Sequence, residues 1–400
     1  MAGSPHRNYP TIHIAGTNGK GSTAAMIASV LTASGYRTGL YTSPHLRNFS
    51  ERIRIDGKKI TESEVVEYIK LFKPEIVARK ATFFEATTAI AFKYFSDQSV
   101  DVAVIETGLG GRLDATNVIT PELCVITDIG IDHTAHLGKT LKEIAFEKGG
   151  IIKPGVCCVT TASNKDALRE LRLIARSQKS ELVEADKFSS EHVLSCALSE
   201  TKLDISISGI VFHNLTLSLS GMHQIRNLRG ALTALCCLSA AGRFGKITEG
   251  SIRRGLAGIR VNTGLRGRLD VINLSPLIIS DVAHNPEGMR VLTEGLRQLL
   301  PGRFVVVFGV MSDKNYSEMI RVIVPFARIL IAASPRTPRA LGSGKIVSCV
   351  HTAGGRAVEG VDTANCLEIA RNEVRTNETI VVTGSHYVVG EVFEHIGIVP

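Results

Sequence analysis

One glycine-rich stretch constrains the fold of this chain more than any other feature. Residues 11–15 are a short, mainly apolar run, and residues 16–22 read Gly-Thr-Asn-Gly-Lys-Gly-Ser. Residues 23–34 then place Ala, Ile and Leu at helical spacing. A strand, a glycine loop and a helix suit a nucleotide phosphate, because loop N–H groups and the helix N-terminus face the anion while lysine adds charge. Gly21 separates Lys20 from Ser22, so the strict phosphate-loop pattern is not met and an ordinary strand-to-helix turn stays an alternative.

The rest of the chain predicts alternating strands and helices. Apolar strands are expected at residues 38–42, 100–106, 123–127 and 156–160, with helices between them at 62–72, 84–95 and 141–148. Polar residues collect where the strands end, which is typical of a doubly wound parallel sheet of the phosphate-loop ATPase type. Residues 203–207 and 215–219 alternate with period two and predict a small antiparallel sheet.

The second half repeats the strand–helix rhythm. Strands are expected at residues 277–280, 304–308, 329–333 and 379–383, and helices at 227–241 and 286–300. Four hundred residues exceed one ordinary core. Residues 260–267 are polar and rich in Gly and Asn, so we expect an interdomain linker there. We therefore predict an ATP-binding α/β domain over residues 1–262, a hinge at 263–267, and a Rossmann-like α/β domain over 268–400.

Composition narrows the ligand and the compartment. The net charge of +8 favours an anionic ligand. The Lys and Arg residues are dispersed and not interleaved with aromatic side chains, so we expect no nucleic-acid partner. No apolar run is long enough for a membrane helix, and residues 1–10 lack an apolar signal core, so we expect a cytoplasmic protein whose eight cysteines are reduced.

Four polar residues are expected at the sheet edge that holds Lys20. Ser43, Glu106 and His133 each follow an apolar strand, and Lys148 lies one helix further on. A hydroxyl, a carboxylate and an imidazole suit Mg²⁺ when nucleotide phosphates complete its shell. Each of these residues has a structural alternative. Ser43 would be a turn hydroxyl and Glu106 a capping or ion-paired carboxylate. His133 would be a core histidine and Lys148 a solvated helix-end cation. No Ser-His-Asp or Cys-His set stands out, which favours phosphoryl transfer, a reaction that needs no protein nucleophile.

Together these segments make the chain resemble one enzyme family. Residues 16–22 resemble the phosphate loop of the Mur ligase superfamily, and the glycine after lysine resembles its folylpolyglutamate synthase and dihydrofolate synthase branch. Mur ligases of cell-wall synthesis usually place Thr or Ser directly after that lysine. The other matching segments, in order, are residues 41–46, 51–53, 83–88, 106–117, 132–138, 147–148, 221–227, 267–269, 281–286 and 383–385.

The resemblance implies roles for individual residues. It implies that the ATP phosphates and the rest of the nucleotide are bound by Thr17, Asn18, Gly19, Lys20, Gly21, Ser22, Asn227, Arg268 and Asp281. It implies Mg²⁺ ligands at Ser43, Glu106, His133 and Lys148, the last as a carbamylated lysine, with two metal ions. The catalytic set would be Lys20, Lys148, Arg268 and His284, the histidine lying near the γ-phosphate and the incoming glutamate. The pterin-side pocket would include Phe84, Glu85, Ala86, Thr87, Leu113, Asp114 and Ala115.

The implied activity is ATP- and Mg²⁺-dependent ligation of L-glutamate to dihydropteroate, to tetrahydrofolate or to both, through an acyl phosphate, by a monomer. A Mur-type amino-acid ligase of cell-wall synthesis and a non-catalytic nucleotide-binding homologue are the alternatives. Family members usually carry a helical segment before the phosphate loop, and residues 4–5 onward resemble its end, so we expect this chain to begin late relative to them. His386 stands where leucine is usual, and we expect this change to preserve activity.

Overall fold

A computed structural model describes residues 3–400 of the chain. Its first part is built on an eight-stranded sheet in the order β4-β3-β2-β5-β1-β6-β7-β8, in which only β3 and β4 run antiparallel to their neighbours. The strands are β1 Thr11–Ala15, β2 Thr38–Tyr41, β3 Ile53–Ile55, β4 Lys58–Lys59, β5 Val102–Glu106, β6 Leu123–Ile126, β7 Cys158–Thr160 and β8 Leu182–Glu184. The predicted parallel sheet is confirmed, with β3 and β4 as an unexpected antiparallel edge.

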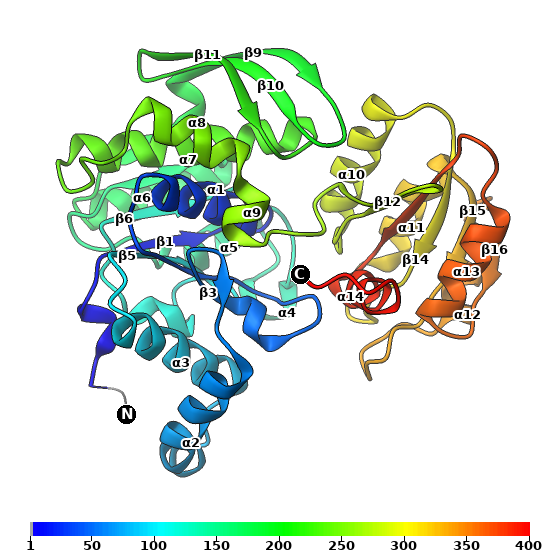
Figure 1. Cartoon of the computed structure of the whole chain (residues 1–400), viewed down its shortest axis with the longest axis horizontal. Coiled ribbons are helices and arrows are strands. Elements are labelled where there is room, and N and C mark those ends of the chain that lie inside the picture. Colours follow the sequence, from blue (N-terminus) through cyan, green and yellow to red (C-terminus); the bar gives the residue numbers. More distant parts are fainter. Residues whose placement is uncertain (1–2) are drawn as a thin grey trace.

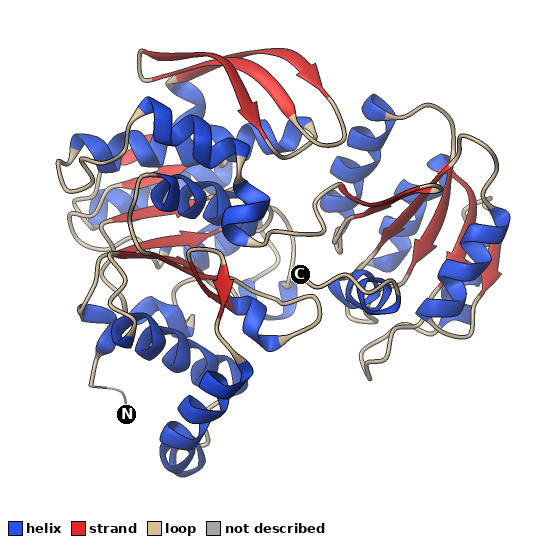
Figure 2. Ribbon diagram, in the orientation of Figure 1, coloured by secondary structure: helices blue, strands red, loops and turns tan. Residues whose placement is uncertain are grey.

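Helices cover both faces of this sheet (Figures 1 and 2). One face packs against α1 Lys20–Ala33, α7 Met222–Ala240, α8 Glu249–Ala257 and α9 Ile259–Thr263. The other packs against α3 Phe83–Asp97, α5 Leu141–Gly149 and α6 Lys165–Ser177. The short helix α4 is Thr134–Leu137, and α2, Glu62–Arg79, extends past Pro74 with only Phe72 buried. Burial of two apolar faces explains why the sheet is doubly wound.

A three-stranded antiparallel sheet lies over the α7 and α8 side of the first sheet (Figure 1). It contains β9 Ser189–Cys196, β10 Thr201–Ile207 and β11 Ile210–Leu217. The predicted small antiparallel sheet is confirmed, although its last strand begins at Ile210 and ends at Leu217. The alternation in β10 is the reason it could be predicted, since every second residue is buried.

The second part of the chain is a six-stranded sheet in the order β12-β13-β17-β14-β15-β16. The strands are β12 Asp270–Leu274, β13 Leu277–Ser280, β14 Phe304–Phe308, β15 Ala327–Ala332, β16 Ala357–Glu359 and β17 Thr379–Thr383. All pairings are parallel except that of β12 with β13. One face packs on α10 Pro286–Leu299, α11 Tyr316–Ile323 and α12 Ser343–Thr352, and the other on α13 Thr363–Glu373 and α14 His386–His395.

The connection between the two sheets is shorter than the sequence suggested. Residues 260–263, expected to begin a linker, belong to helix α9, and the Thr263 hydroxyl donates a hydrogen bond to the Ile259 carbonyl. Only residues 264–269 then lead to β12. Local Gly and Asn content concealed this helix because it is stabilised by burial of Ile259 and Thr263 rather than by helix propensity.

Within residues 3–400, none of the helices is sufficiently long and apolar to cross a lipid bilayer.

Candidate active site

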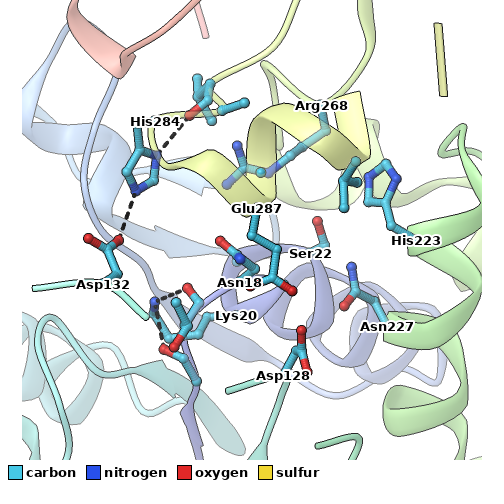
Figure 3. Close-up of a pocket in the computed structure, with 18 of the residues that line it drawn as sticks. Asn18, Lys20, Ser22, Asp128, Asp132, His223, Asn227, Arg268, His284 and Glu287 are labelled. Atoms are coloured by element: carbon cyan, nitrogen blue, oxygen red, sulfur yellow. Dashed lines mark hydrogen bonds and ion pairs between the residues drawn. The ribbon is translucent and has the colours of Figure 1, made fainter. Parts of the chain in front are cut away.

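The predicted nucleotide, metal and catalytic residues come from both halves of the chain and line one cavity. Its volume is about 410 Å³, and it lies between the carboxyl ends of the strands of the two sheets. Residues 17–22, Ser43, Glu106, His133, Lys148, Asn227, Arg268, Asp281 and His284 all line it. This is where ligands bind in open α/β folds. Figure 3 shows the labelled side chains converging from both halves.

The phosphate loop turns directly into helix α1. Gly19 is the N-cap residue of α1 with φ 87°, a conformation that favours glycine. A side chain at position 19 would also collide with Asn227, because its Cβ would lie 2.2 Å from the Asn227 Oδ1. The Lys20 ammonium donates to the carbonyl oxygens of Gly16 (3.1 Å) and Thr17 (3.2 Å). The helix N-terminus and this ammonium therefore present positive charge to the cavity.

Ser43 and Glu106 lie together beside this loop. The Ser43 N–H donates to the Glu106 Oε2 at 3.1 Å. Burial raises the pKa of the Glu106 carboxyl, while the nearby Lys20 ammonium opposes that rise. Gly21 lies next to two charged side chains: a Cβ there would be 3.7 Å from the Glu106 Oε2 and 3.9 Å from an Arg268 guanidinium nitrogen, which are ordinary contacts. A carboxylate from the first sheet and a guanidinium from the second half thus both lie close to the loop at Gly21.

These donors fit a divalent cation that completes its shell with phosphate oxygens. Mg²⁺ is usually held by one or two carboxylates plus substrate phosphates and water, rather than by an all-protein cage. No cluster of three His, Cys, Asp or Glu side chains with metal-binding geometry occurs in the described part of the chain. Ser43 and Glu106 are the predicted ligands that contact each other.

His133 faces a different set of partners. Its Nε2 lies 3.4 Å from the Lys314 ammonium and 3.9 Å from the Asp132 Oδ2. It adopts a left-handed conformation with φ 51° at the start of α4. The predicted ligand therefore lines the cavity, while its nearest charged neighbours are Asp132 and Lys314.

Lys148 is buried beneath the phosphate loop. Its side chain lies in α5, is 4% exposed, and donates to the Gly16 carbonyl at 2.7 Å. Burial, followed by the Lys20 ammonium, lowers the pKa of Lys148 to about 7. The sequence alternative of a solvated helix-end cation is therefore wrong.

The second sheet contributes Arg268, Asp281 and His284. The Asp281 carboxylate accepts from the N–H groups of Leu269 (3.0 Å) and Ala283 (2.9 Å), so it shapes the backbone on either side of Arg268 and His284. The His284 Nδ1 donates to the Val282 carbonyl at 2.8 Å, which leaves Nε2 toward the cavity. Burial, followed by the Lys314 ammonium, lowers the pKa of His284 to about 4, so its imidazole is neutral at neutral pH.

A polar network that sequence reasoning missed joins the two halves. The Lys314 ammonium pairs with the Asp132 carboxylate at 2.8 Å, and both side chains are nearly buried. The Asn285 amide donates to the Asn18 Oδ1 (3.1 Å) and to the Asp132 Oδ2 (3.2 Å). Burial favours neutral Asp132, but Lys314 outweighs it and holds the pKa of that carboxyl well below its usual range. The position of Lys314, shortly after strand β14 ends, was the signal available in the sequence.

The predicted pterin-side residues lie outside this cavity. Glu85 accepts from the backbone and hydroxyl of Thr82 and so caps α3. Asp114 accepts from the Leu109 N–H at 2.8 Å and from Thr116, which fixes its own loop. Leu113 is 79% exposed. Local structural roles thus account for Glu85 and Asp114, and acceptor binding by this set stays a prediction.

Comparison with known proteins identifies the family. Residues 14–235 match the Mur ligase middle domain, and residues 267–386 match the Mur ligase glutamate ligase domain. The chain belongs to the Mur ligase family.

Within the Mur ligase family, the curated and solved relatives are folate enzymes. The chain is 34% identical to the dihydrofolate synthase/folylpolyglutamate synthase of Bacillus subtilis, over 98% of this chain and 91% of that one. The folylpolyglutamate synthase of Mycobacterium tuberculosis, solved with ADP and AMPPCP, superposes with a TM-score of 0.92 at 32% identity, covering 100% of this chain and 93% of that one. A bifunctional folylpolyglutamate synthase/dihydrofolate synthase with Mn, AMPPNP and L-glutamate bound superposes with a TM-score of 0.86 at 27% identity, covering 98% and 91%. The predicted family and its folate branch are confirmed.

Proposed function

We propose that this chain is an ATP-dependent ligase that joins L-glutamate to the carboxylate of a pteroate or folate acceptor. One observation carries the proposal: a single cavity brings the phosphate loop and Glu106 from the first sheet against Arg268 and His284 from the second. The reaction brings together a triphosphate, an acceptor carboxylate and an amine. A cavity lined by residues from both sheets can bind all three groups at once. Relatives named dihydrofolate synthase and folylpolyglutamate synthase supply the acceptor class.

The chemistry balances without a protein nucleophile. An oxygen of the acceptor carboxylate attacks the γ-phosphorus of ATP, the bond to ADP breaks, and an acyl phosphate forms. The glutamate amine then attacks the acyl carbon, and inorganic phosphate leaves with the former carboxylate oxygen. Lys20 and Arg268 carry the positive charge that opposes the charge developing on the transferred group. We propose that the neutral His284 accepts the proton that the amine loses, through Nε2, since Nδ1 donates to the Val282 carbonyl.

A divalent cation would be held by Ser43, Glu106 and His133, and it would neutralise the phosphate oxygens during transfer. We further propose that Lys148 is carbamylated and supports a second metal ion. The two observations that favour this are its burial and its proximity to Lys20: two ammonium groups repel each other there, whereas a carbamate would attract both Lys20 and a cation. A pKa of about 7 leaves much of the amine neutral, and the neutral amine is the form that reacts with carbon dioxide.

The contacts between the two halves give the site a way to exclude water. Lys314, Asn285 and Asp132 join the rims of the cavity. An acyl phosphate hydrolyses in water, so a closed cavity protects the intermediate. We propose that residues 263–267 act as the hinge, that residues 84–87 and 113–115 contact the acceptor, and that the enzyme works as a monomer.

The test is phosphate release with ATP and glutamate, measured in parallel with dihydropteroate, with tetrahydrofolate and without acceptor. We expect release only with an acceptor, together with a product heavier by one glutamyl residue in mass spectrometry. Turnover with both acceptors would make the enzyme bifunctional. Phosphate release that is indifferent to acceptor and glutamate would contradict the proposal.

A further inference from the structure

A second, smaller cavity lies beside the active site and carries a charge that the proposed function does not use. Its volume is about 70 Å³, and it opens between strand β3, helix α9 and helix α14. Figure 1 shows these three elements at the junction of the two halves. Liquid water occupies about 30 Å³ per molecule, so the space fits about two waters or one carboxylate group.

Arg54 of strand β3 is the unexplained group in this cavity. Its side chain is 6% exposed, and its one hydrogen bond within residues 3–400 goes from NH1 to the Gly57 carbonyl at 3.0 Å. Glu51 is the nearby carboxylate in the same cavity, but it forms no ion pair with Arg54 and accepts instead from the N–H groups of residues 46, 47 and 48. Among the described residues, no Arg54 nitrogen is both fully enclosed and without a partner, so its remaining N–H groups open onto the cavity. They are free to donate to an anion there.

The rest of the wall supports an anion. The Arg54 guanidinium lies flat against Gly264, where a Cβ would come within 2.5 Å of its central carbon, so a side chain there would displace it. Arg268 also lines this cavity and makes no ion pair within the described chain, whereas Arg266 pairs with Asp270. Two carboxylates line the cavity as well: Glu51, which accepts from three backbone N–H groups, and Glu106, which accepts from the Ser43 N–H. Arg54 and Arg268 are then the two guanidinium groups of this wall that form no ion pair within the described residues.

This cavity adjoins the larger one and shares part of its wall. Ser43, Glu106, Arg268 and His386 line both cavities. The His386 ring lies 5.1 Å from the His284 ring, centroid to centroid. An anion in the smaller cavity would therefore lie next to the proposed phosphate and metal site.

We propose that Arg54 binds the non-reacting α-carboxylate of an acceptor that ends in glutamate. This rests on the proposed function. Such an acceptor reacts through its γ-carboxylate, and its α-carboxylate lies about 5 Å away across four bonds. A pteroate acceptor has no second carboxylate, so Arg54 distinguishes the two acceptor classes and serves polyglutamylation alone.

The experiment pairs a protein change with a ligand change. Binding of tetrahydrofolate, and of its analogue with an α-carboxamide, is measured by equilibrium dialysis with a non-hydrolysable ATP analogue, for the wild type and for Arg54→Gln. We expect the carboxamide to weaken binding to the wild type by about tenfold to a hundredfold, the range for a hydrogen bond between charged groups. Arg54→Gln should weaken tetrahydrofolate binding by the same factor and change carboxamide binding less than about twofold.

Controls separate this result from a folding defect and from failure of the proposed function. Arg328→Gln changes another largely buried arginine, which pairs with Glu378 away from both cavities, and should leave acceptor binding unchanged. Arg54→Lys, which keeps the charge, should restore part of the affinity. Arg54→Gln and the α-carboxamide each weaken acceptor binding. If the two losses of affinity add up when the variant is tested with the carboxamide, the inference is overturned. It is also overturned if Arg54→Gln raises only the KM for glutamate. If the Arg54 inference fails while the wild type still turns over, the proposed ligase activity is retained. If the wild type binds neither acceptor, both the Arg54 inference and the proposed ligase activity are refuted.

Discussion

The separation of the two halves can be tested at Gly390. This glycine lies in α14 of the second half, and a Cβ there would lie 2.0 Å from the backbone carbonyl oxygen of Leu46 in the first half. Real Cβ atoms essentially never approach closer than 3.0 Å, so Gly390→Ala must move α14 and the residue 46 backbone apart by about 1 Å. His386 lies one turn earlier in α14 and lines the cavity, so it moves as well.

We expect a loss of activity without a loss of stability. A misplacement of about 1 Å costs up to about a hundredfold in rate, so kcat/KM for acceptor-dependent phosphate release should fall by about tenfold to a hundredfold. Helix propensity alone would act in the opposite direction, because alanine stabilises a helix interior by about 1 kcal/mol relative to glycine. Crowding at a packed site costs about 1–3 kcal/mol, so the two effects largely offset each other and the thermal unfolding of the variant should change only slightly.

The matched control is Gly250→Ala in helix α8. Gly250 is exposed, and the nearest atom to its added Cβ is the flexible end of Arg254 at 3.4 Å. This variant should keep full activity. If Gly390→Ala also keeps kcat/KM within about twofold of the wild type, then the reaction does not depend on this spacing of the two halves, and our account of closure is wrong.

Three further predictions concern single side chains. Glu106→Gln removes a negative charge from the proposed metal site, so kcat should fall by about a hundredfold and a titration of activity with Mg²⁺ should shift to higher concentration; an unchanged titration would exclude Glu106 as a ligand. Wild-type protein equilibrated with ¹³C-bicarbonate should show a carbamate carbon resonance that Lys148→Met lacks, and the same resonance in both would place the carbamate elsewhere. Burial, followed by the Asp128 carboxylate, raises the pKa of Glu287 from its ordinary 4.5 to about 7, so Glu287 stabilises the fold most fully below about pH 4.5 and loses that contribution as pH rises through about 7. Denaturant unfolding at about pH 5 and about pH 8 should therefore show a smaller pH dependence for Glu287→Gln than for the wild type, and equal dependence would contradict the assignment.

Much of the site could be predicted because strand ends are visible in the sequence. Ser43 and Glu106 follow apolar runs that belong to one parallel sheet, so their proximity follows from topology, and they contact each other in the structure. The phosphate loop is equally local, since the strand, the loop and helix α1 are consecutive. Helix α1 is buried on nearly all sides and therefore shows almost no amphipathic pattern. The sequence predicts where this helix lies in the chain, but it does not show which face packs on the sheet.

Contacts across the two halves could not be predicted. The pairing of Lys314 with Asp132 depends on how one folded sheet is placed against the other, and no local pattern encodes that placement. Arg54 posed the same difficulty, since an arginine in a three-residue strand is usually exposed to solvent. Its burial becomes visible only when α9 and residue 264 lie over it.

The most direct test of the central claim follows one oxygen atom. The acceptor is prepared with ¹⁸O in its reacting carboxylate and incubated with the enzyme, ATP and glutamate, and the released phosphate is analysed by mass spectrometry. Attack of the carboxylate on the γ-phosphorus predicts one ¹⁸O atom in each phosphate released. Phosphate without ¹⁸O would mean that water, and not the acceptor, receives the phosphoryl group, and it would contradict the ligase mechanism.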